Sequence, residues 1–171
     1  MTSEIRLAKK GEGSVIADLL YQSFNQYKSF YTPAAFRATV VSARELEERI
    51  CNEATWVASV NGAISATISL TPSPDSIFIR SLAVLPGARG LGLGKNLMAH
   101  AEEIARKRRV KLLELTSLAF LNEAMALYKS LGFVSYGMEE FHGLSLIKMM
   151  KKLEAHEAES AEKRLLKLKK L

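Results

Sequence analysis

A glycine-rich run between a predicted strand and a predicted helix constrains this chain most. The apolar segment 77–84 is typical of a buried strand, and the run 85–95 (LPGARGLGLGK) leads directly into a helical pattern. Glycine recurs at every second position of that run, at Gly90, Gly92 and Gly94. Such spacing lets backbone N–H groups converge on a ligand, and Arg89 and Lys95 add positive charge on either side. The run predicts a phosphate or diphosphate site at a helix N-terminus, with a ligand-free turn as the alternative.

Two familiar phosphate-binding motifs do not fit this run. A P-loop ending at the Gly-Lys pair would place Arg89 at its first glycine and Asn96 at its Ser or Thr. A dinucleotide fingerprint would need a third glycine where the chain has Lys95 or Leu97, depending on the starting glycine. P-loop nucleotide hydrolysis and dinucleotide binding are therefore not indicated.

The remaining elements predict a single α/β (α+β) domain. Strands are expected at 4–8, 55–60, 63–70, 77–84, 111–116, 133–136 and 144–150, and helices at 14–28, 36–41, 42–52, 93–105 and 122–130. The strand, glycine run, helix and strand over 77–116 form a right-handed parallel crossover. Asn61-Gly62 marks a tight hairpin, and the other connections favour antiparallel pairing. We expect a mixed, mostly antiparallel sheet with helices on both faces.

Two sequence blocks carry a resemblance to a known family. The first is Arg-x-x-Gly-x-Gly at 89–94, and the second is the segment 122–133 (NEAMALYKSLGF). In this order and separation they resemble the GNAT superfamily of N-acetyltransferases, over roughly Ile5 to Lys151. The resemblance implies a GNAT fold and transfer of an acetyl group from acetyl-CoA to a primary amine, by direct attack in a ternary complex.

The same resemblance implies where the cofactor binds. In GNAT enzymes the strands beside the glycine loop splay apart, and the pantetheine arm pairs with exposed backbone of the first strand. A backbone N–H near Val84 would polarise the thioester carbonyl, and Asn122 would contact the pantetheine arm. The implied cofactor residues are Leu82, Ala83, Val84, Arg89, Gly90, Leu91, Gly92, Leu93, Gly94, Lys95 and Asn122.

Catalytic groups are less evident than cofactor groups. Tyr128 matches the family's general acid, and a phenol with a pKa near 10 stays protonated at neutral pH. The alternative is a tyrosine that only packs its helix against the core. No base is identified, because Arg80-Ser81 stands where many relatives have a Glu. Glu114, residues 139–140 (both Glu) and a water relay remain open.

The GNAT resemblance also implies that the acceptor pocket is built by the first two helices and the loop between the last strands. These regions carry an aromatic set and a short polar segment: Tyr27, Phe30, Tyr31, Phe36 and 139–142. The aromatics suit an apolar or aromatic amine, whereas Glu139 and Glu140 suit a cationic one. Small-molecule amines and protein amino groups both remain open.

Composition sets the remaining expectations. The 171 residues suffice for one core, and we expect an acetyltransferase domain at 1–152 and a basic, helical tail at 153–171. No long apolar run or secretory signal is evident, so a cytoplasmic location is expected. One cysteine and scattered histidines predict neither a disulfide framework nor a metal site.

Three other possibilities are left open by the sequence. A homodimer is one. A CoA-binding regulatory module without turnover is the second, because the strand Glu is missing. The third is a basic nucleic-acid-binding domain that uses the tail, given a net charge of +6. Acyl-CoA is itself polyanionic, so a modest positive charge has a simpler use.

Overall fold

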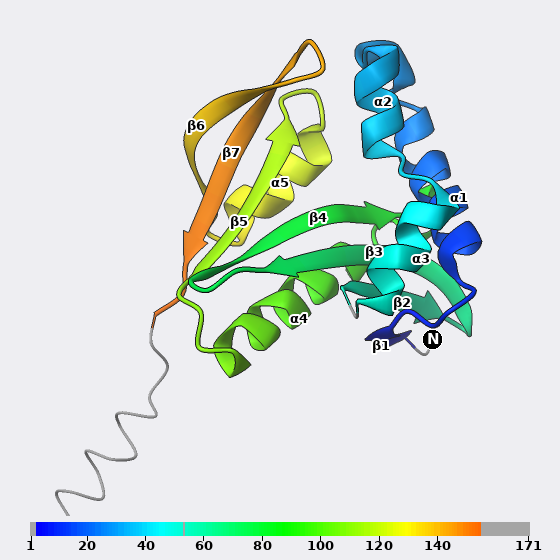
Figure 1. Cartoon of the computed structure of the whole chain (residues 1–171), viewed down its shortest axis with the longest axis horizontal. Coiled ribbons are helices and arrows are strands. Elements are labelled where there is room, and N and C mark those ends of the chain that lie inside the picture. Colours follow the sequence, from blue (N-terminus) through cyan, green and yellow to red (C-terminus); the bar gives the residue numbers. More distant parts are fainter. Residues whose placement is uncertain (1–2, 53, 155–171) are drawn as a thin grey trace, which may run out of the picture.

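A computed structural model describes residues 3–52 and 54–154, in which seven strands form one sheet (Figure 1). The strand order is β1-β2-β3-β4-β5-β7-β6, and only the β4–β5 pair is parallel. The strands are β1 (Ser3–Leu7), β2 (Thr55–Val60), β3 (Ala63–Pro72), β4 (Ser76–Val84), β5 (Leu112–Leu118), β6 (Val134–Phe141) and β7 (Leu144–Lys152). The mixed, mostly antiparallel sheet with one parallel crossover is thus confirmed.

Helices cover both faces of the sheet, as expected. They are α1 (Gly13–Asn25), α2 (Pro33–Thr39), α3 (Ala43–Cys51), α4 (Leu93–Lys107) and α5 (Asn122–Ser130). One hydrophobic core lies under α4 and α5, and a second lies under α1 and α3. The neighbours Val57 and Ala58 on β2 are both fully buried, because alternate strand residues point into opposite cores.

The sheet opens between β4 and β5, and this opening positions the site. Parallel pairing runs from Ser76 and Leu112 to Ile79 and Leu115, after which the two strands part (Figure 1). Beyond that point β4 pairs only with β3, while β5 continues along β7. The pairing with β3 shifts register here, and Ser81 takes a φ of 53°. Such a β-bulge bends the strand and redirects its side chains.

Three predicted elements differ from the structure by three residues or more at one end. Helix α1 ends at Asn25 rather than at 28. Helix α2 begins at Pro33 rather than at 36, because the Thr32 hydroxyl accepts a hydrogen bond from the Ala35 N–H and proline suits the first helical position. Strand β6 extends to Phe141, well past the predicted end at 136. Gly137 and two glutamates disfavour a strand locally, yet an edge strand tolerates them since both its faces are exposed.

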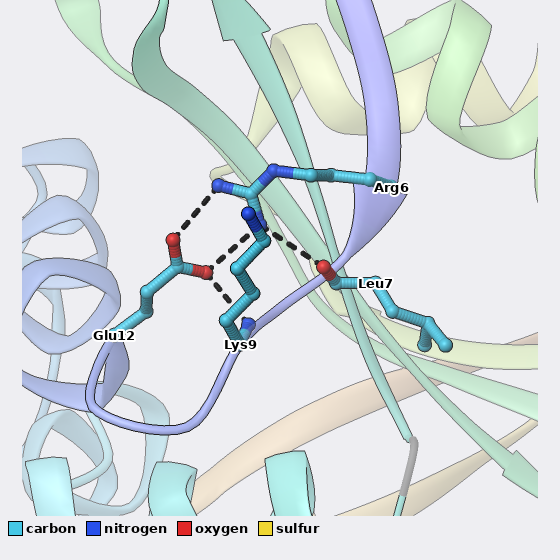
Figure 2. Close-up of polar contacts among 4 residues, drawn as sticks. All are labelled: Arg6, Leu7, Lys9 and Glu12. Atoms are coloured by element: carbon cyan, nitrogen blue, oxygen red, sulfur yellow. Dashed lines mark hydrogen bonds and ion pairs between the residues drawn. The ribbon is translucent and has the colours of Figure 1, made fainter.

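A small hydrogen-bond network holds the turn that leads from β1 into α1 (Figure 2). The Arg6 guanidinium donates to both Glu12 carboxylate oxygens, at 2.9 and 2.8 Å, and to the Leu7 carbonyl. The Glu12 carboxylate also accepts from the Lys9 N–H at 2.7 Å. These bonds hold the turn between β1 and α1, and α1 in turn carries several residues to the site.

Glycine at position 13 lets α1 approach α3 closely. A Cβ there would lie 2.7 Å from the Ala43 carbonyl oxygen, and the Gly13 N–H donates to Glu47 of α3 at 2.7 Å. The α1–α3 pair therefore forms a unit whose spacing a side chain at Gly13 would disturb.

The C-terminal edge of the described chain is anchored on the sheet. The Leu153 N–H donates to the Lys111 carbonyl at 2.8 Å, and the Leu153 side chain is buried. Of the predicted helical tail at 153–171, residues 153–154 are not helical, and residues 155–171 lie outside the described residues. Within the part that is described, no helix is long and apolar enough to cross a membrane.

Candidate active site

The glycine run forms the N-terminus of α4, as predicted. Gly92 precedes the helix with a φ of 76°, and a Cβ there would be strained by that φ. The first helical hydrogen bond joins the Asn96 N–H to the Gly92 carbonyl. The N–H groups of Leu93, Gly94 and Lys95 therefore have no intrahelical partner, and they suit an anion. No carboxylate occupies this first turn to compete with one.

Arg89 ties this loop to two helices. Its guanidinium donates to the Ser23 carbonyl of α1 at 3.2 Å and lies 3.8 Å from the Glu123 carboxylate of α5. The Glu123 side chain is 72% exposed, so this pair contributes little energy, about 0–1 kcal/mol. Arg89 thus mainly positions the loop between α1 and α5.

The end of β4 presents backbone toward the opening. The Leu85 N–H donates to the Ser65 carbonyl of β3, so the preceding residue, Val84, directs its N–H and C=O away from β3. In agreement, the Val84 carbonyl accepts a hydrogen bond from the Ser23 hydroxyl of α1 at 3.1 Å. The Val84 N–H faces the same way, where the resemblance implies a donor for the thioester carbonyl.

One cavity of about 360 Å³ runs along the glycine loop and the end of β4. It brings together all of the predicted cofactor residues except Leu91, which is 42% exposed, and Asn122, an exposed residue at the start of α5. The lining residues shared with the prediction are Leu82, Ala83, Val84, Arg89, Gly90, Gly92, Leu93, Gly94 and Lys95. The donor set and the open backbone at Gly92 fit the diphosphate and pantetheine parts of coenzyme A.

A second cavity of about 250 Å³ lies beyond the β4–β5 opening. Its walls come from several elements: Phe24, Tyr31, Ala38, Thr39, Arg49, Phe78, Ile79, Arg80, Ser81, Leu82, Thr116, Ser117, Leu118, Leu121, Ala124, Tyr128, Phe141 and Leu146. Five residues line both cavities: Phe24, Leu82, Leu121, Ala124 and Tyr128. The two cavities therefore meet at these residues, and Tyr128 is the one among them with an ionisable group.

Tyr128 is buried where the cavities meet. Only 7% of the residue is exposed, and its ring lies 6.1 Å from that of Phe133. Desolvation raises the pKa of the Tyr128 phenol well above 10, with no charged neighbour opposing the shift. The phenol is therefore protonated across the physiological range. The packing role and the acid role predicted for Tyr128 are compatible, because its ring packs beside Phe133 while the residue also lines both cavities.

The four aromatic residues predicted to line the acceptor pocket lie in different parts of the structure. Tyr31 lines the second cavity, whereas Tyr27 lines the first. Phe36 is buried beside Tyr31, with ring centroids 5.6 Å apart. Phe30 is 59% exposed and stacks on Phe120 at 5.4 Å. Only Tyr31 of the four contributes a wall to the second cavity.

None of the carboxylates considered as bases lines either of the two cavities that meet at Tyr128. Glu114 accepts a hydrogen bond from the Tyr136 hydroxyl at 3.0 Å. Glu139 and Glu140 lie on the edge strand β6, not in the predicted loop, and they line a separate shallow hollow near the β6–β7 turn. A fixed carboxylate base is therefore absent from the described walls of the second cavity.

Sequence reasoning missed several residues that the fold brings to the two cavities, among them Ser23, Phe24 and Arg49. Ser23 had a detectable signal, because it is a small polar residue on the same helical face as Leu19 and Leu20 and is 4% exposed. Arg49 had none, since arginine on a helix is usually solvated. Arg80 stands where many relatives have a Glu, which marked its position in the sequence but not its place on the wall of the second cavity.

Comparison with known proteins identifies the family and agrees with the fold. The family model described as "Acetyltransferase (GNAT) family" matches residues 17–133, about two thirds of the chain. The chain belongs to this family, a class of acyltransferase enzymes. A curated relative, the uncharacterized N-acetyltransferase YjgM of Escherichia coli (strain K12), is 37% identical over 82 residues. That match spans 46% of this chain and 49% of the relative, so the chain matches about half of the relative's length.

Solved structures share the whole fold at low sequence identity. PaiA N-acetyltransferase from Thermoplasma acidophilum, in complex with coenzyme A, is 20% identical with a TM-score of 0.77, covering 90% of this chain and all of that one. YncA from Salmonella typhimurium, with acetyl-CoA, is 22% identical with a TM-score of 0.68, covering 91% and 96%. A ribosomal-protein-alanine N-acetyltransferase from Brucella melitensis is 28% identical with a TM-score of 0.67, covering 88% and 99%.

Proposed function

We propose that this protein transfers an acetyl group from acetyl-CoA to a primary amine, by direct attack within a ternary complex. The observation that carries the proposal is the meeting of two cavities at Tyr128. One cavity offers helix N-terminal donors that suit a diphosphate, and the other is large enough for a small amine. A direct transfer requires such an arrangement, because both substrates must reach one point at the same time.

Acetyl-CoA supplies an electrophilic thioester carbonyl. The N–H groups at the start of α4, with Gly92 before them, bind the diphosphate. The backbone at Leu82 to Val84 holds the pantetheine arm, and the Val84 N–H donates to the carbonyl oxygen as negative charge develops on it. Tyr128, protonated at neutral pH, donates its proton to the departing sulfur. Leu91 and Asn122 stay proposed contacts for the outer parts of the cofactor.

The amine must lose a proton without a neighbouring carboxylate. Arg49 and Arg80 line the second cavity, and positive charge disfavours an ammonium close to them. We propose that a water chain carries the proton to solvent through the open end of this cavity. Serine and threonine hydroxyls on the cavity wall, at Ser81, Thr116 and Ser117, provide hydrogen-bonding groups for such waters.

Calorimetric titration with acetyl-CoA tests the proposal, with desulfo-CoA and ATP as comparisons. We expect micromolar acetyl-CoA binding and much weaker ATP binding, followed by thiol release when amines are screened. Absence of acetyl-CoA binding would refute the assignment of the glycine loop. Binding without turnover across the screen would favour the CoA-binding regulatory module.

A further inference from the structure

The second cavity has positive charge on its walls and no carboxylate among its described lining residues. Arg49 of α3 donates to the Ser81 hydroxyl at 3.0 Å, and Arg80 of β4 lies over the Phe78 ring at 5.7 Å. Neither guanidinium is within ion-pair distance of a carboxylate in residues 3–52 and 54–154. Arg49, held by a hydroxyl, and Arg80, held over a ring, both lack a carboxylate partner there. Each guanidinium is therefore able to bind an anion.

The two arginines influence each other. Burial lowers the pKa of the half-buried Arg49, and the positive charge of Arg80 lowers it further. Glu45 opposes this shift from one helical turn away, but its exposed carboxylate is bound to the Ser42 N–H and hydroxyl. Glu114, beside Phe78 across the parallel pair, is bound to Tyr136. Both nearby carboxylates are therefore occupied elsewhere.

A buried phenol, Tyr31, also lines the same cavity. The residue is 7% exposed, and its hydroxyl oxygen is closed off from solvent beside the Thr39 hydroxyl. Burial raises the pKa of Tyr31 to about 12, and the Thr39 hydroxyl only partly opposes the shift. The phenol is therefore neutral and leaves the positive charge of the cavity wall uncompensated.

We propose that the acceptor of this enzyme is a primary amine that also bears a carboxylate, such as a free amino acid. The inference rests on the proposed function, because it names the substrate class of the same site. Arg49 at the wall and Arg80 at the exposed rim bind the carboxylate, which a guanidinium holds through paired N–H donors. The amine then lies toward Tyr128, where the cavities meet. Polyamines and amines without an anionic group are disfavoured by the same two charges.

The first test compares matched acceptors in the thiol-release assay. The turnover of free α-amino acids is compared with that of their α-carboxamides, of a peptide with an N-terminal alanine, and of a linear diamine. We expect the carboxylate form to be favoured by roughly 10- to 100-fold in kcat/KM, the value of a hydrogen bond to a charged group. Equal or better turnover of the amides, the peptide or the diamine overturns the inference while leaving the proposed function intact.

Substitutions locate the preference at the arginines. Arg80→Met should remove most of the preference, and Arg80→Glu should reverse it toward the diamine, both with acetyl-CoA affinity unchanged. Arg44→Met is the matched control, because Arg44 lies on α3 with a 90% exposed side chain and pairs only with Glu48 in the described structure. A preference that survives Arg80→Glu overturns the assignment.

A binding measurement makes the inference independent of turnover. N-acetylated amino acids and their carboxamides are titrated calorimetrically into the protein saturated with CoA. Tighter binding of the free acids, lost in Arg80→Glu, supports the inference, and equal binding overturns it. Failure of CoA itself to bind refutes the proposed function, which distinguishes the two failures.

Discussion

The two cavities on either side of Tyr128 are built in different ways. The first cavity is the proposed cofactor site. Its walls come mostly from one stretch of chain, 82–95, whose backbone N–H groups are its principal donors. The second cavity is the proposed acceptor site. Its walls come from α1, α2, α3, β4, β5, α5 and the β6–β7 pair, and side chains supply its polar groups. A site made of local backbone tolerates many sequences, whereas a site made of distant side chains changes with each substitution. The first suits a constant cofactor and the second a particular acceptor.

The two cavities also differ in how charge is arranged. In the first cavity, positive charge comes from the partial charges at the start of α4, because Arg89 forms an ion pair with Glu123. The acceptor side has two guanidinium groups and no carboxylate within its described walls. Substitutions on the two sides should therefore have separable effects on cofactor affinity and on acceptor preference.

Gly92→Asp should abolish cofactor binding while leaving the acceptor cavity intact. The carboxylate would repel the diphosphate, and the loss of two charge-assisted hydrogen bonds, about 2 kcal/mol each, corresponds to about 1,000-fold in affinity. Calorimetric titration with acetyl-CoA measures it. Gly62→Asp is the matched control, because Gly62 has a similar φ of 84° at the remote β2–β3 turn. Unchanged affinity in Gly92→Asp would contradict the placement of the diphosphate.

Tyr128→Phe removes the phenol hydroxyl where the two cavities meet and keeps the ring that lines both of them. We expect kcat to fall by about 100-fold, the value of a general acid, while acetyl-CoA affinity stays nearly constant. Steady-state kinetics and calorimetry together provide this distinction. Tyr21→Phe is the control, since Tyr21 is 43% exposed on α1. A Tyr128→Phe variant with full turnover would remove the phenol from the acid role and leave it a packing residue.

Ser23→Ala should weaken the cofactor side slightly. The variant loses the hydrogen bond from the Ser23 hydroxyl to the Val84 carbonyl, which contributes about 1 kcal/mol to the free energy of unfolding. Because the end of β4 is then held less firmly, acetyl-CoA should bind more weakly, by about 5-fold at most. The preference for carboxylate-bearing acceptors should not change. Ser14→Ala, at an exposed position of the same helix, is the control. A change in acceptor preference would mean that α1 couples the two cavities.

Glu12→Gln should reduce stability by about 1 kcal/mol and leave both cavities unchanged. The Arg6 hydrogen bond lowers the pKa of Glu12 below its usual 4.5, so the folded state favours the ionised carboxyl. The contribution is present above about pH 4.5 and is lost as the pH falls through the lowered folded-state pKa. Thermal unfolding from pH 7 to pH 3 should show the wild type and the variant converging in acid.

Glu48→Gln is the control for that measurement, because the Arg44–Glu48 pair is exposed and 3.5 Å apart. Its loss should change the midpoint very little at any pH. A pH-independent gap between the wild type and Glu12→Gln would indicate that the effect comes from packing rather than from the ionised carboxylate.

Local signals predicted those parts of the fold that depend on neighbouring residues. The capping box before α3 is present, with Ser42 and Glu45 bonded reciprocally. The Asn61-Gly62 hairpin joins β2 and β3, and helix α4 follows the glycine run. Strand β6 was predicted too short because its stability comes from pairing with β7 rather than from local propensity. The cap at Thr32 was overlooked, and with it the start of α2.

By itself, the sequence determined the loop proposed to bind the cofactor. A strand, a glycine run and a helix start lie within twenty residues of one another, and this local pattern is enough to define a loop lined with backbone donors. It also determined Tyr128 as a candidate, through its place in a recognisable block. Only the tertiary structure decided the acceptor side. Arg49 and Arg80 are 31 positions apart and resemble ordinary solvated residues in the sequence. They line the same cavity because the Arg49 guanidinium of α3 reaches Ser81 at the bulge of β4, a juxtaposition that no local pattern encodes.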